Sequence, residues 1–291
     1  MYSFKLMSFN IAGYDATLEA ARRWESRAAQ CINILHNHKP DLIGLQEVQV
    51  QNRATLDKYL TRYACEYGAK TCFQTDENTV YNPIYWRPDR FEMIDAGSFY
   101  LSETPEVWSK TWDAMQVRSA TWIRLRCIQS NATFIHTNVH LDHYGSQARI
   151  ESSKLIVAKL MQLRQVDNSA LIVSGDFNAR AWVPADEDVH LYNPPILPHR
   201  LPAGNTVHQI YTDRDFKDVY LEAGYKNQLS MNTYHSYYGD SFPPVALRID
   251  WILILNSAQR IRTQKYFIID DANPPIYPSD HYPIMAELAW Y

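Results

Sequence analysis

Cysteine is scarce in this 291-residue sequence, and its cysteines form no recognisable metal-binding or redox motif. The four cysteines form no CxxC pair, which argues against a zinc knuckle and against a thioredoxin-type centre. They are Cys31, Cys65, Cys72 and Cys127. Cys65 and Cys72 could form a disulfide in an oxidising compartment. Four thiols in a chain of this length are more typical of a reduced protein, so we expect a cytoplasmic location.

Long apolar runs are also missing. No run approaches the ~20 apolar residues that a membrane-spanning helix needs. The opening residues, Met1 to Met7, lack the charged and apolar regions of a signal peptide, and no apolar hairpin suited to membrane insertion is evident. We therefore expect no membrane insertion, and we take a monomer as the working expectation.

The sequence has no excess of positive charge. Its formal net charge is −4 and its pI is about 6.2, whereas domains that hold long nucleic acids usually have a pI above about 9. This argues against tight, non-specific binding of duplex DNA. Cleavage of nucleic acid stays possible, because a bound metal ion can supply the local positive charge.

The remaining composition is that of a soluble globular domain. Hydrophobic residues make up 46% of the chain and charged residues 21%, close to ordinary values. Short apolar strands alternate with amphipathic helices, which is typical of a layered α/β domain. We predict strands at residues 4–10, 41–47, 84–86, 121–127, 133–140, 170–174, 247–255, 266–269 and 284–290.

Apolar residues at three- and four-residue spacing predict helices within 18–35, 56–63 and 147–165. Fewer helices separate the last strands, which favours a mixed or antiparallel sheet. Gly175 is expected to allow a sharp turn. Residues 184–202 contain five prolines and predict a long surface loop, a kind of segment that is often functional. We expect one domain spanning residues 1–291.

Polar residues recur at the ends of the apolar strands. They are Asn10, Glu47, His140, Asp176, Asn178, Asp250, Asp280 and His281. Each has an ordinary explanation alone, as a turn residue, a cap or a hydrogen-bonded core side chain. Together they suggest a site, because buried carboxylates need a cation or donors and strand ends in layered α/β folds converge on one rim. Oxygen ligands without cysteine favour Mg²⁺ or Mn²⁺.

Six segments resemble, in the same order, those of the endonuclease/exonuclease/phosphatase superfamily. They are residues 8–11, 46–47, 138–143, 175–179, 248–252 and 279–281. The resemblance runs from Asn10 to His281 and covers nearly the whole chain. It implies a four-layer α/β sandwich in which two mixed central sheets are flanked by helices.

The chain looks nearest to small bacterial members of the superfamily that are related to the deadenylase and nocturnin branch. Residues 108–114, 118–122 and 233–235 are similar to theirs. The sequence departs from them at 181–215, which is longer and richer in proline than the usual connection. Carried-over substrate specificity is therefore in doubt around that segment.

The resemblance also implies roles for single residues. Glu47 would be the main metal ligand, with Asn10 and Asp280 completing or supporting the metal shell. Asp176 would orient or deprotonate the attacking water, and Asn178 would donate a hydrogen bond to a phosphoryl oxygen. His281, oriented by Asp250, would contact the phosphate. His140 would protonate the leaving oxygen or stabilise the transition state.

Candidate substrate contacts are less specific. Arg118, Arg149 and Arg248 could clamp substrate oxygens, since a guanidinium matches phosphate geometry, or they could form surface ion pairs. Trp108, Trp112, Tyr144 and Tyr234 could stack on a base or sugar, or simply pack. His143 is expected to play a supporting role.

The predicted activity is divalent-metal-dependent hydrolysis of a phosphate ester. Our first hypothesis is a phosphodiester of a nucleic acid or nucleotide. The alternative is a phosphomonoester of a small molecule such as a sugar, an inositol phosphate or a nucleotide. A protein that only binds a phosphorylated ligand is a third possibility, which the complete set of motif residues argues against.

Overall fold

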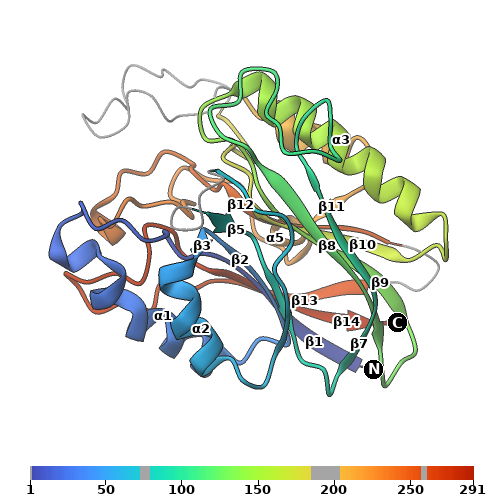
Figure 1. The fold of residues 1–291 in the computed structure, drawn as a ribbon, viewed down its shortest axis with the longest axis horizontal. Coiled ribbons are helices and arrows are strands. Elements are labelled where there is room, and N and C mark those ends of the chain that lie inside the picture. Colours follow the sequence, from blue (N-terminus) through green and yellow to red (C-terminus); the bar gives the residue numbers. More distant parts are fainter. Residues whose placement is uncertain (1, 73–78, 185–203, 257–260) are drawn as a thin grey trace.

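Two six-stranded sheets pack face to face in the computed structural model, which describes residues 2–72, 79–184, 204–256 and 261–291 (Figure 1). Helices cover the outer face of each sheet, so the expected four-layer α/β sandwich is confirmed. In Figure 1, α1 and α2 lie on one side of the sheets and α3 on the other.

The first sheet is built around the N-terminal strand. Its order is β13 (Ile261–Ile268), β14 (Ile284–Trp290), β1 (Tyr2–Asn10), β2 (Leu42–Gln46), β6 (Ile84–Trp86) and β4 (Ala64–Glu66). β1 pairs with β2 in parallel, and all other neighbours are antiparallel. The sheet is therefore mixed, as predicted.

The second sheet carries more of the polar strand ends. Its order is β11 (Lys217–Asp218), β12 (Asp250–Leu255), β10 (Ala170–Asp176), β9 (Thr133–His140), β8 (Ser119–Cys127) and β7 (Phe91–Tyr100). β9 and β10 are parallel and the other pairs antiparallel. A short pair, β3 (Val48–Gln49) with β5 (Val80–Tyr81), lies beyond the end of β2.

Each of the longer helices buries one face against a sheet, as the spacing of apolar residues predicted. α1 (Trp24–His38) and α2 (Val50–Tyr59) pack on the first sheet, and α3 (Ser146–Arg164) and α4 (Thr206–Thr212) pack on the second. A four-residue helix, α5 (Val219–Glu222), follows β11. Short 3₁₀ turns occupy Ala20–Arg22 and Gly239–Ser241.

Several predicted boundaries need correction. The helix predicted at 56–63 is α2, which begins at Val50 and ends at Tyr59. β7 was not predicted, because this edge strand is mostly exposed and its register shifts between Met93 and Asp95, which breaks the alternation that marks a strand. β13 begins at Ile261 rather than at 266, since its early residues are largely polar on an edge strand.

Gly175 does not form the sharp turn that we expected. It lies inside β10 with φ +148°, and a Cβ there would sit 2.0 Å from the carbonyl oxygen of Val139 on the neighbouring strand. Glycine is required because β9 and β10 approach closely at this point. The close contact brings His140 and Asp176 level at the ends of the two strands.

The long loop predicted at 184–202 lies outside the described residues except for Pro184. The described part that follows is helical: α4 buries Val207 and Tyr211 against the second sheet. Among the described residues, no helix combines the length and apolarity needed to cross a membrane. All four cysteines are free thiols, so the alternative of a disulfide between Cys65 and Cys72 is not realised.

Alternation along the central strands sorts their side chains between two layers. The core between the sheets is formed by inward-facing residues at the end of the sandwich where the two chain termini lie. Examples are Phe4, Leu6 and Phe134. Outward-facing residues, such as Met7 and Phe9, pack under the helices. Continuing two residues at a time along β1 leads from Phe4 through Leu6 and Ser8 to Asn10, so the inner face becomes polar at one end.

A buried polar contact joins the two sheets just below this polar end. The side-chain amide of Asn138 donates to the carbonyl oxygens of Leu45 (2.7 Å) and Pro83 (2.9 Å), and its Oδ1 accepts from Gln46 (2.7 Å). Gly44 permits this approach, because a Cβ there would lie 2.9 Å from Asn138 Cγ. One side chain of the second sheet therefore makes three hydrogen bonds to the first.

We predict that Asn138→Ala destabilises the protein by ~3 kcal/mol, because it leaves buried backbone and side-chain groups without partners. Urea unfolding followed by tryptophan fluorescence measures the change. Gln129→Ala, at an exposed position after β8, is the control and should change stability by less than ~0.5 kcal/mol. Equal stability of the two variants would contradict the role given to Asn138.

Candidate active site

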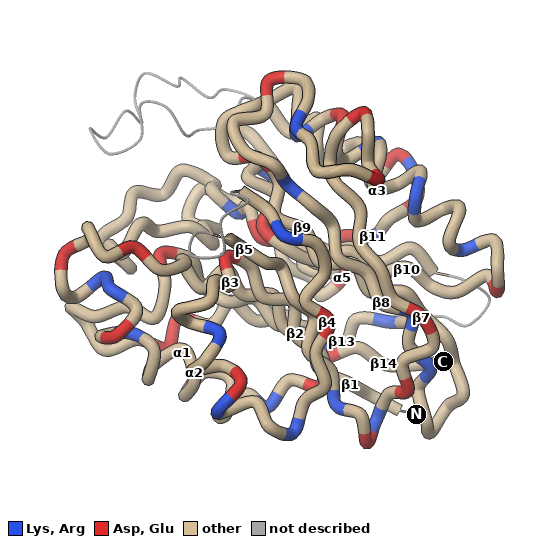
Figure 2. Tube along the Cα trace, in the orientation of Figure 1, with Lys and Arg blue, Asp and Glu red and all other residues tan. Residues whose placement is uncertain are grey.

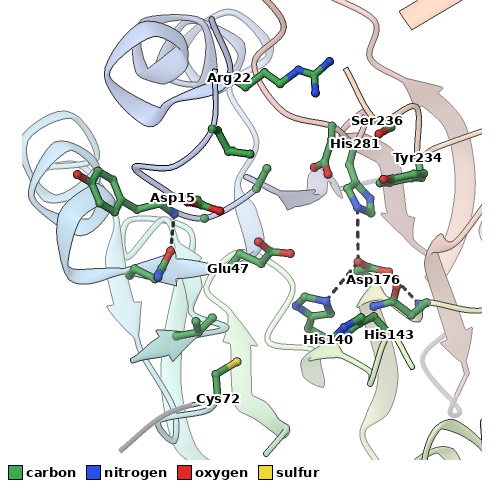
Figure 3. A pocket seen from close by; sticks show the side chains of 18 of the residues that line it. Asp15, Arg22, Glu47, Cys72, His140, His143, Asp176, Tyr234, Ser236 and His281 are labelled. Carbon is green, nitrogen blue, oxygen red and sulfur yellow. Dashed lines mark hydrogen bonds and ion pairs between the residues drawn. The ribbon is translucent and has the colours of Figure 1, made fainter. Parts of the chain in front are cut away.

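The polar ends of the central strands meet around one cavity of about 900 Å³. Glu47, His140, Asp176, Asp280 and His281 all line it. Figure 3 shows Glu47, Asp176, His140 and His281 facing the same space from both sheets. The polar strand ends therefore converge in the structure, as the sequence predicted.

Asn10 links the carboxylates of the two sheets. Its Nδ2 donates to Glu47 Oε1 and to Asp176 Oδ2, both at 3.0 Å, and its Oδ1 accepts from the backbone N–H of Ala12 at 2.9 Å. Both amide hydrogens are thus directed at carboxylates. In this geometry Asn10 holds Glu47 and Asp176 in place.

His281 lies between two buried carboxylates. Its Nδ1 is 2.9 Å from Asp250 Oδ2, and its Nε2 is 3.7 Å from Asp176 Oδ2. His140 approaches the same oxygen of Asp176 with its Nε2 at 3.4 Å. Asp176 Oδ1 is fixed separately, because it accepts from the backbone N–H of Asn178 at 2.8 Å.

These contacts set the protonation of the two histidines in opposite directions. Burial lowers the pKa of His281, but the charges of Asp250 and Asp176 outweigh that effect and hold it well above its ordinary value. Burial lowers the pKa of His140 well below its ordinary value, and the positive charges of Arg118 and His281 lower it further. These surroundings favour the charged form of His281 and the neutral form of His140.

Glu47 and Asp280 offer the oxygen ligands that a divalent cation requires. Glu47 has φ +63° and follows β2 directly, which places its side chain beyond the strand end. Burial and the nearby carboxylate of Asp280 both raise the pKa of Glu47. Two carboxylates that repel one another in a largely buried cavity fit a hard cation such as Mg²⁺ or Mn²⁺.

A second group, Asp176, Asp250 and His281, also brings possible ligand atoms within 4.8 Å of one another. The Asp250–His281 contact at 2.9 Å is a hydrogen bond that occupies one atom of each side chain. The His281 ring is hydrogen-bonded to Asp250 and faces Asp176 at 3.7 Å, so a proton on the imidazole already balances these carboxylates. Glu47 and Asp280 have no such cationic side chain hydrogen-bonded to them within the described residues.

Three of the predicted substrate contacts line the cavity: Arg118, His143 and Tyr234. Arg118 is 5% exposed and donates from Nη2 to His143 Nδ1 at 3.1 Å. Its Nε is buried and has no hydrogen-bond partner within the described part of the chain. Tyr234 packs edge-on against His281, with ring centroids 5.0 Å apart.

The other predicted substrate contacts are not in the cavity. Among the described residues, its lining includes neither Trp108, Trp112 nor Tyr144, and Tyr144 is 69% exposed. Arg149 is buried in α3 and donates to the carbonyl oxygen of Asp142 at 2.9 Å, so its alternative as a surface ion pair is also wrong. Arg149 joins α3 to the segment that follows β9.

Arg248 is buried as well, and its partner is Asp218. The two side chains form an ion pair with Nη2–Oδ2 of 2.7 Å, and the Arg248 guanidinium lies over the ring of Tyr220. Despite burial, the charges of Arg248 and His208 and their hydrogen bonds lower the pKa of Asp218 to about 2. Arg248 therefore anchors β11 beside β12 and does not clamp substrate.

Sequence reasoning missed two residues that shape the site through the backbone. Asp142 accepts from the N–H groups of Met115, Gln116, Tyr144 and Gly145. Arg27 is fully buried and donates to five backbone carbonyls, which include those of Gly13, Arg22 and Pro278. An arginine on the apolar face of a predicted helix was the available signal.

Comparison with known proteins agrees with this architecture. The model of the endonuclease/exonuclease/phosphatase family matches residues 7–281. A protein of that family from Bacteroides thetaiotaomicron is 26% identical, with a TM-score of 0.79 over 99% of this chain and 95% of that one.

Two further solved structures and one curated sequence are more distant. A mannosyl-6-phosphatase of Bacteroides thetaiotaomicron is 24% identical, with a TM-score of 0.79 over 98% of this chain and 99% of that one. The human nocturnin catalytic domain with bound sulfate is 18% identical, with a TM-score of 0.70 over 99% and 95%. An uncharacterized protein of Acanthamoeba polyphaga mimivirus is 24% identical over 60% of this chain, which spans 66% of that protein's length.

We predict that Arg248→Met destabilises the fold by about 3–5 kcal/mol, because it leaves the Asp218 carboxylate buried without its cation. Arg126→Met is the control: Arg126 pairs with Glu92 on the surface, and its loss should cost less than ~1 kcal/mol. Chemical denaturation measures both. A normal stability for Arg248→Met combined with weaker substrate binding would restore its predicted role as a clamp.

Proposed function

Because the chain belongs to the endonuclease/exonuclease/phosphatase family, we propose that it is a divalent-metal-dependent phosphoesterase that acts on a small phosphorylated molecule. The observation that carries this proposal is the line of contacts from Glu47 through Asn10 and Asp176 to His281. These contacts bring two carboxylates, an amide and an imidazole to one cavity, and this arrangement supports the proposal.

Glu47 and Asp280 would hold the cation, with Asn10 fixing the orientation of Glu47. When bound, a divalent ion polarises a phosphoryl oxygen and offsets the negative charge that develops in the transition state. Asp280 is positioned by its backbone, since its carbonyl oxygen accepts from the N–H groups of His235 (2.8 Å) and Ser236 (3.1 Å).

Asp176 is the residue that would orient the attacking water and take up its proton. Its Oδ1 is held by Asn178, and its Oδ2 receives a hydrogen bond from Asn10 and faces both histidines. The side-chain amide of Asn178 donates one hydrogen to the carbonyl oxygen of Leu141 at 3.0 Å. Its second amide hydrogen is the one that would reach a phosphoryl oxygen.

The two histidines would act differently. Asp250 accepts from His281 Nδ1 and so directs His281 Nε2 toward the cavity, where a cationic N–H can bind a phosphoryl oxygen. An aspartate orienting an imidazole in this way is a recurring arrangement in hydrolases. His140, being neutral, would stabilise the leaving oxygen by hydrogen bonding, rather than supply a proton from an imidazolium.

Cavity size and surface charge support a small substrate. A volume of about 900 Å³ falls within the ~300–1,000 Å³ of small-molecule sites. Figure 2 shows Lys and Arg interspersed with Asp and Glu along the chain instead of gathered into a basic stripe. One of the similar structures is a mannosyl-6-phosphatase, which adds a phosphorylated sugar to the classes worth testing.

Hydrolysis of a nucleotide or nucleic-acid phosphodiester, the first hypothesis from the sequence, is the second candidate. The rings of Tyr14, Tyr234 and Tyr237 line the cavity, and aromatic rings of this kind can stack on a base.

Hydrolysis of a substrate panel tests the proposal, with phosphate release measured for the monoesters and separation of the products by chromatography or gel electrophoresis for the diesters. The panel contains phosphorylated sugars, mononucleotides, dinucleotides, a single-stranded oligonucleotide, plasmid DNA and an artificial diester, each with Mg²⁺, Mn²⁺ or a chelator. We expect metal-dependent turnover of a small phosphomonoester that chelator abolishes. Preferred cleavage of dinucleotides or the oligonucleotide would select the second candidate, and chelator-resistant turnover would exclude the metal-dependent mechanism.

We further predict that Glu47→Gln lowers kcat at least ~10²-fold and weakens Mn²⁺ binding in calorimetric titrations, because it removes the charged ligand. The fold should persist, since the replacement has the same shape. Glu25→Gln, the same change at an exposed position of α1, is the matched control. Near-normal turnover by Glu47→Gln would refute the metal assignment.

A further inference from the structure

Two arginines of the cavity lining have no part in the proposed chemistry: Arg118, which donates to His143, and Arg22. Arg22 lines the cavity from the segment between β1 and α1. Figure 3 shows its side chain on the same side as His281 and Ser236, whereas His140 and His143 lie on the other side of Asp176. The catalytic residues already account for the scissile phosphate, so this second cationic position needs its own explanation.

Arg22 is not neutralised by a buried carboxylate. Within the described ranges its one ion-pair partner is Glu19, at 3.8 Å, whose side chain is 80% exposed. Exposed pairs of this kind contribute little. Its guanidinium carbon instead lies 5.4 Å and 5.8 Å from the ring centroids of Tyr237 and Tyr238. Such packing orients a guanidinium and leaves its N–H groups available to an anion.

Tyr237 connects Arg22 to the catalytic end of the cavity. It follows Ser236, whose backbone N–H bonds to the carbonyl oxygen of Asp280, and both residues have positive φ, 49° and 64°. Non-glycine residues in this conformation are strained and persist where surrounding structure holds them. Burial and the charge of Asp280 raise the pKa of Tyr237, so its hydroxyl stays a neutral donor.

The wall that carries Arg22 is fixed before any ligand binds. The buried Arg27 guanidinium donates to the carbonyl oxygens of Arg22 (2.8 Å), Gly13 (2.6 Å) and Pro278 (3.0 Å), as well as to those of Ile11 and Ala12. It therefore ties the segment after β1 to the segment that precedes Asp280. A cation held in place in this way binds an anion with little loss of conformational freedom.

Asp15 is an acidic residue of the cavity lining that keeps its negative charge but is hydrogen-bonded within its own loop. The carboxylate of Asp15 also lines the cavity, but its Oδ1 accepts from the backbone N–H (2.8 Å) and the hydroxyl (2.6 Å) of Thr17. These hydrogen bonds hold the Asp15 carboxylate within its own loop. Arg22 is the group on this wall that offers N–H donors to a charged ligand.

We propose that Arg22 and Tyr237 form a second anion subsite, so that the preferred substrate carries a second phosphate group besides the one that is hydrolysed. The subsite rests on the proposed phosphoesterase activity, because it belongs to the same cavity. It narrows the substrate class to compact bisphosphorylated molecules. Arg22 determines specificity and takes no part in the bond-breaking step.

A matched pair of non-hydrolysable ligands tests the subsite by binding alone. 1,3-Propylenebisphosphonate and propylphosphonate differ by one phosphonate group, and calorimetry in saturating Mg²⁺ gives the affinity of the full-length protein for each. We expect the bisphosphonate to bind about 10- to 100-fold more tightly, the range for hydrogen bonds between charged groups. The ratio should fall toward 1 in Arg22→Met and stay intermediate in Arg22→Lys.

The controls separate failure of the subsite from failure of the proposed function. Arg62→Met, at an exposed position outside the cavity lining, should keep the wild-type ratio. Equal binding of both ligands to the wild type, or an unchanged ratio in folded Arg22→Met, would overturn the subsite and leave the phosphoesterase proposal intact. Loss of binding of both ligands in the wild type would instead contradict the phosphate site itself.

Discussion

The Asn138 side chain sets the distance on which the candidate site depends. It belongs to the second sheet but makes its three hydrogen bonds to the first, through Leu45, Pro83 and Gln46. The residues of the site are divided between the same two sheets. Asn10 ends β1 and Glu47 follows β2 in the first sheet, whereas His140, Asp176 and Asp250 belong to the second. A small change in sheet separation would therefore alter every cross-sheet contact.

Burying charged groups in the site costs free energy, which the rest of the fold offsets. Burial raises the pKa of Glu47 and opposes the protonation of His281. Burial therefore disfavours the charged form of both side chains. Buried ionisable groups are tolerated when hydrogen bonds and opposite charges fix them. Asn10 and Asp250 fulfil this need, and the large apolar core between the sheets supplies the stability that the polar rim does not.

Elements outside the sheets shape the remainder of the cavity. Arg27 donates to carbonyl oxygens of the segment after β1. Asp142 accepts from backbone N–H groups of two segments, one that precedes Arg118 and one that follows His143. Both act on main-chain atoms, so they fix loops without touching a reacting group. The strand ends and the short segments next to them thus carry the residues proposed for chemistry, while the anchored loops carry those proposed to choose the substrate.

Periodicity and residue order were sufficient for the fold class and for the residues at the strand ends. An apolar strand shows its inner face by alternation, so Asn10, His140, Asp176 and Asp250 could be placed at one rim from the sequence. Arg248 and Arg149 were assigned wrongly, because their partners, Asp218 and the Asp142 carbonyl, are set by packing. The sequence by itself determined which polar strand ends converge on the site. Only the tertiary structure decided which arginines are anchors, because that depends on distances between atoms far apart in the chain.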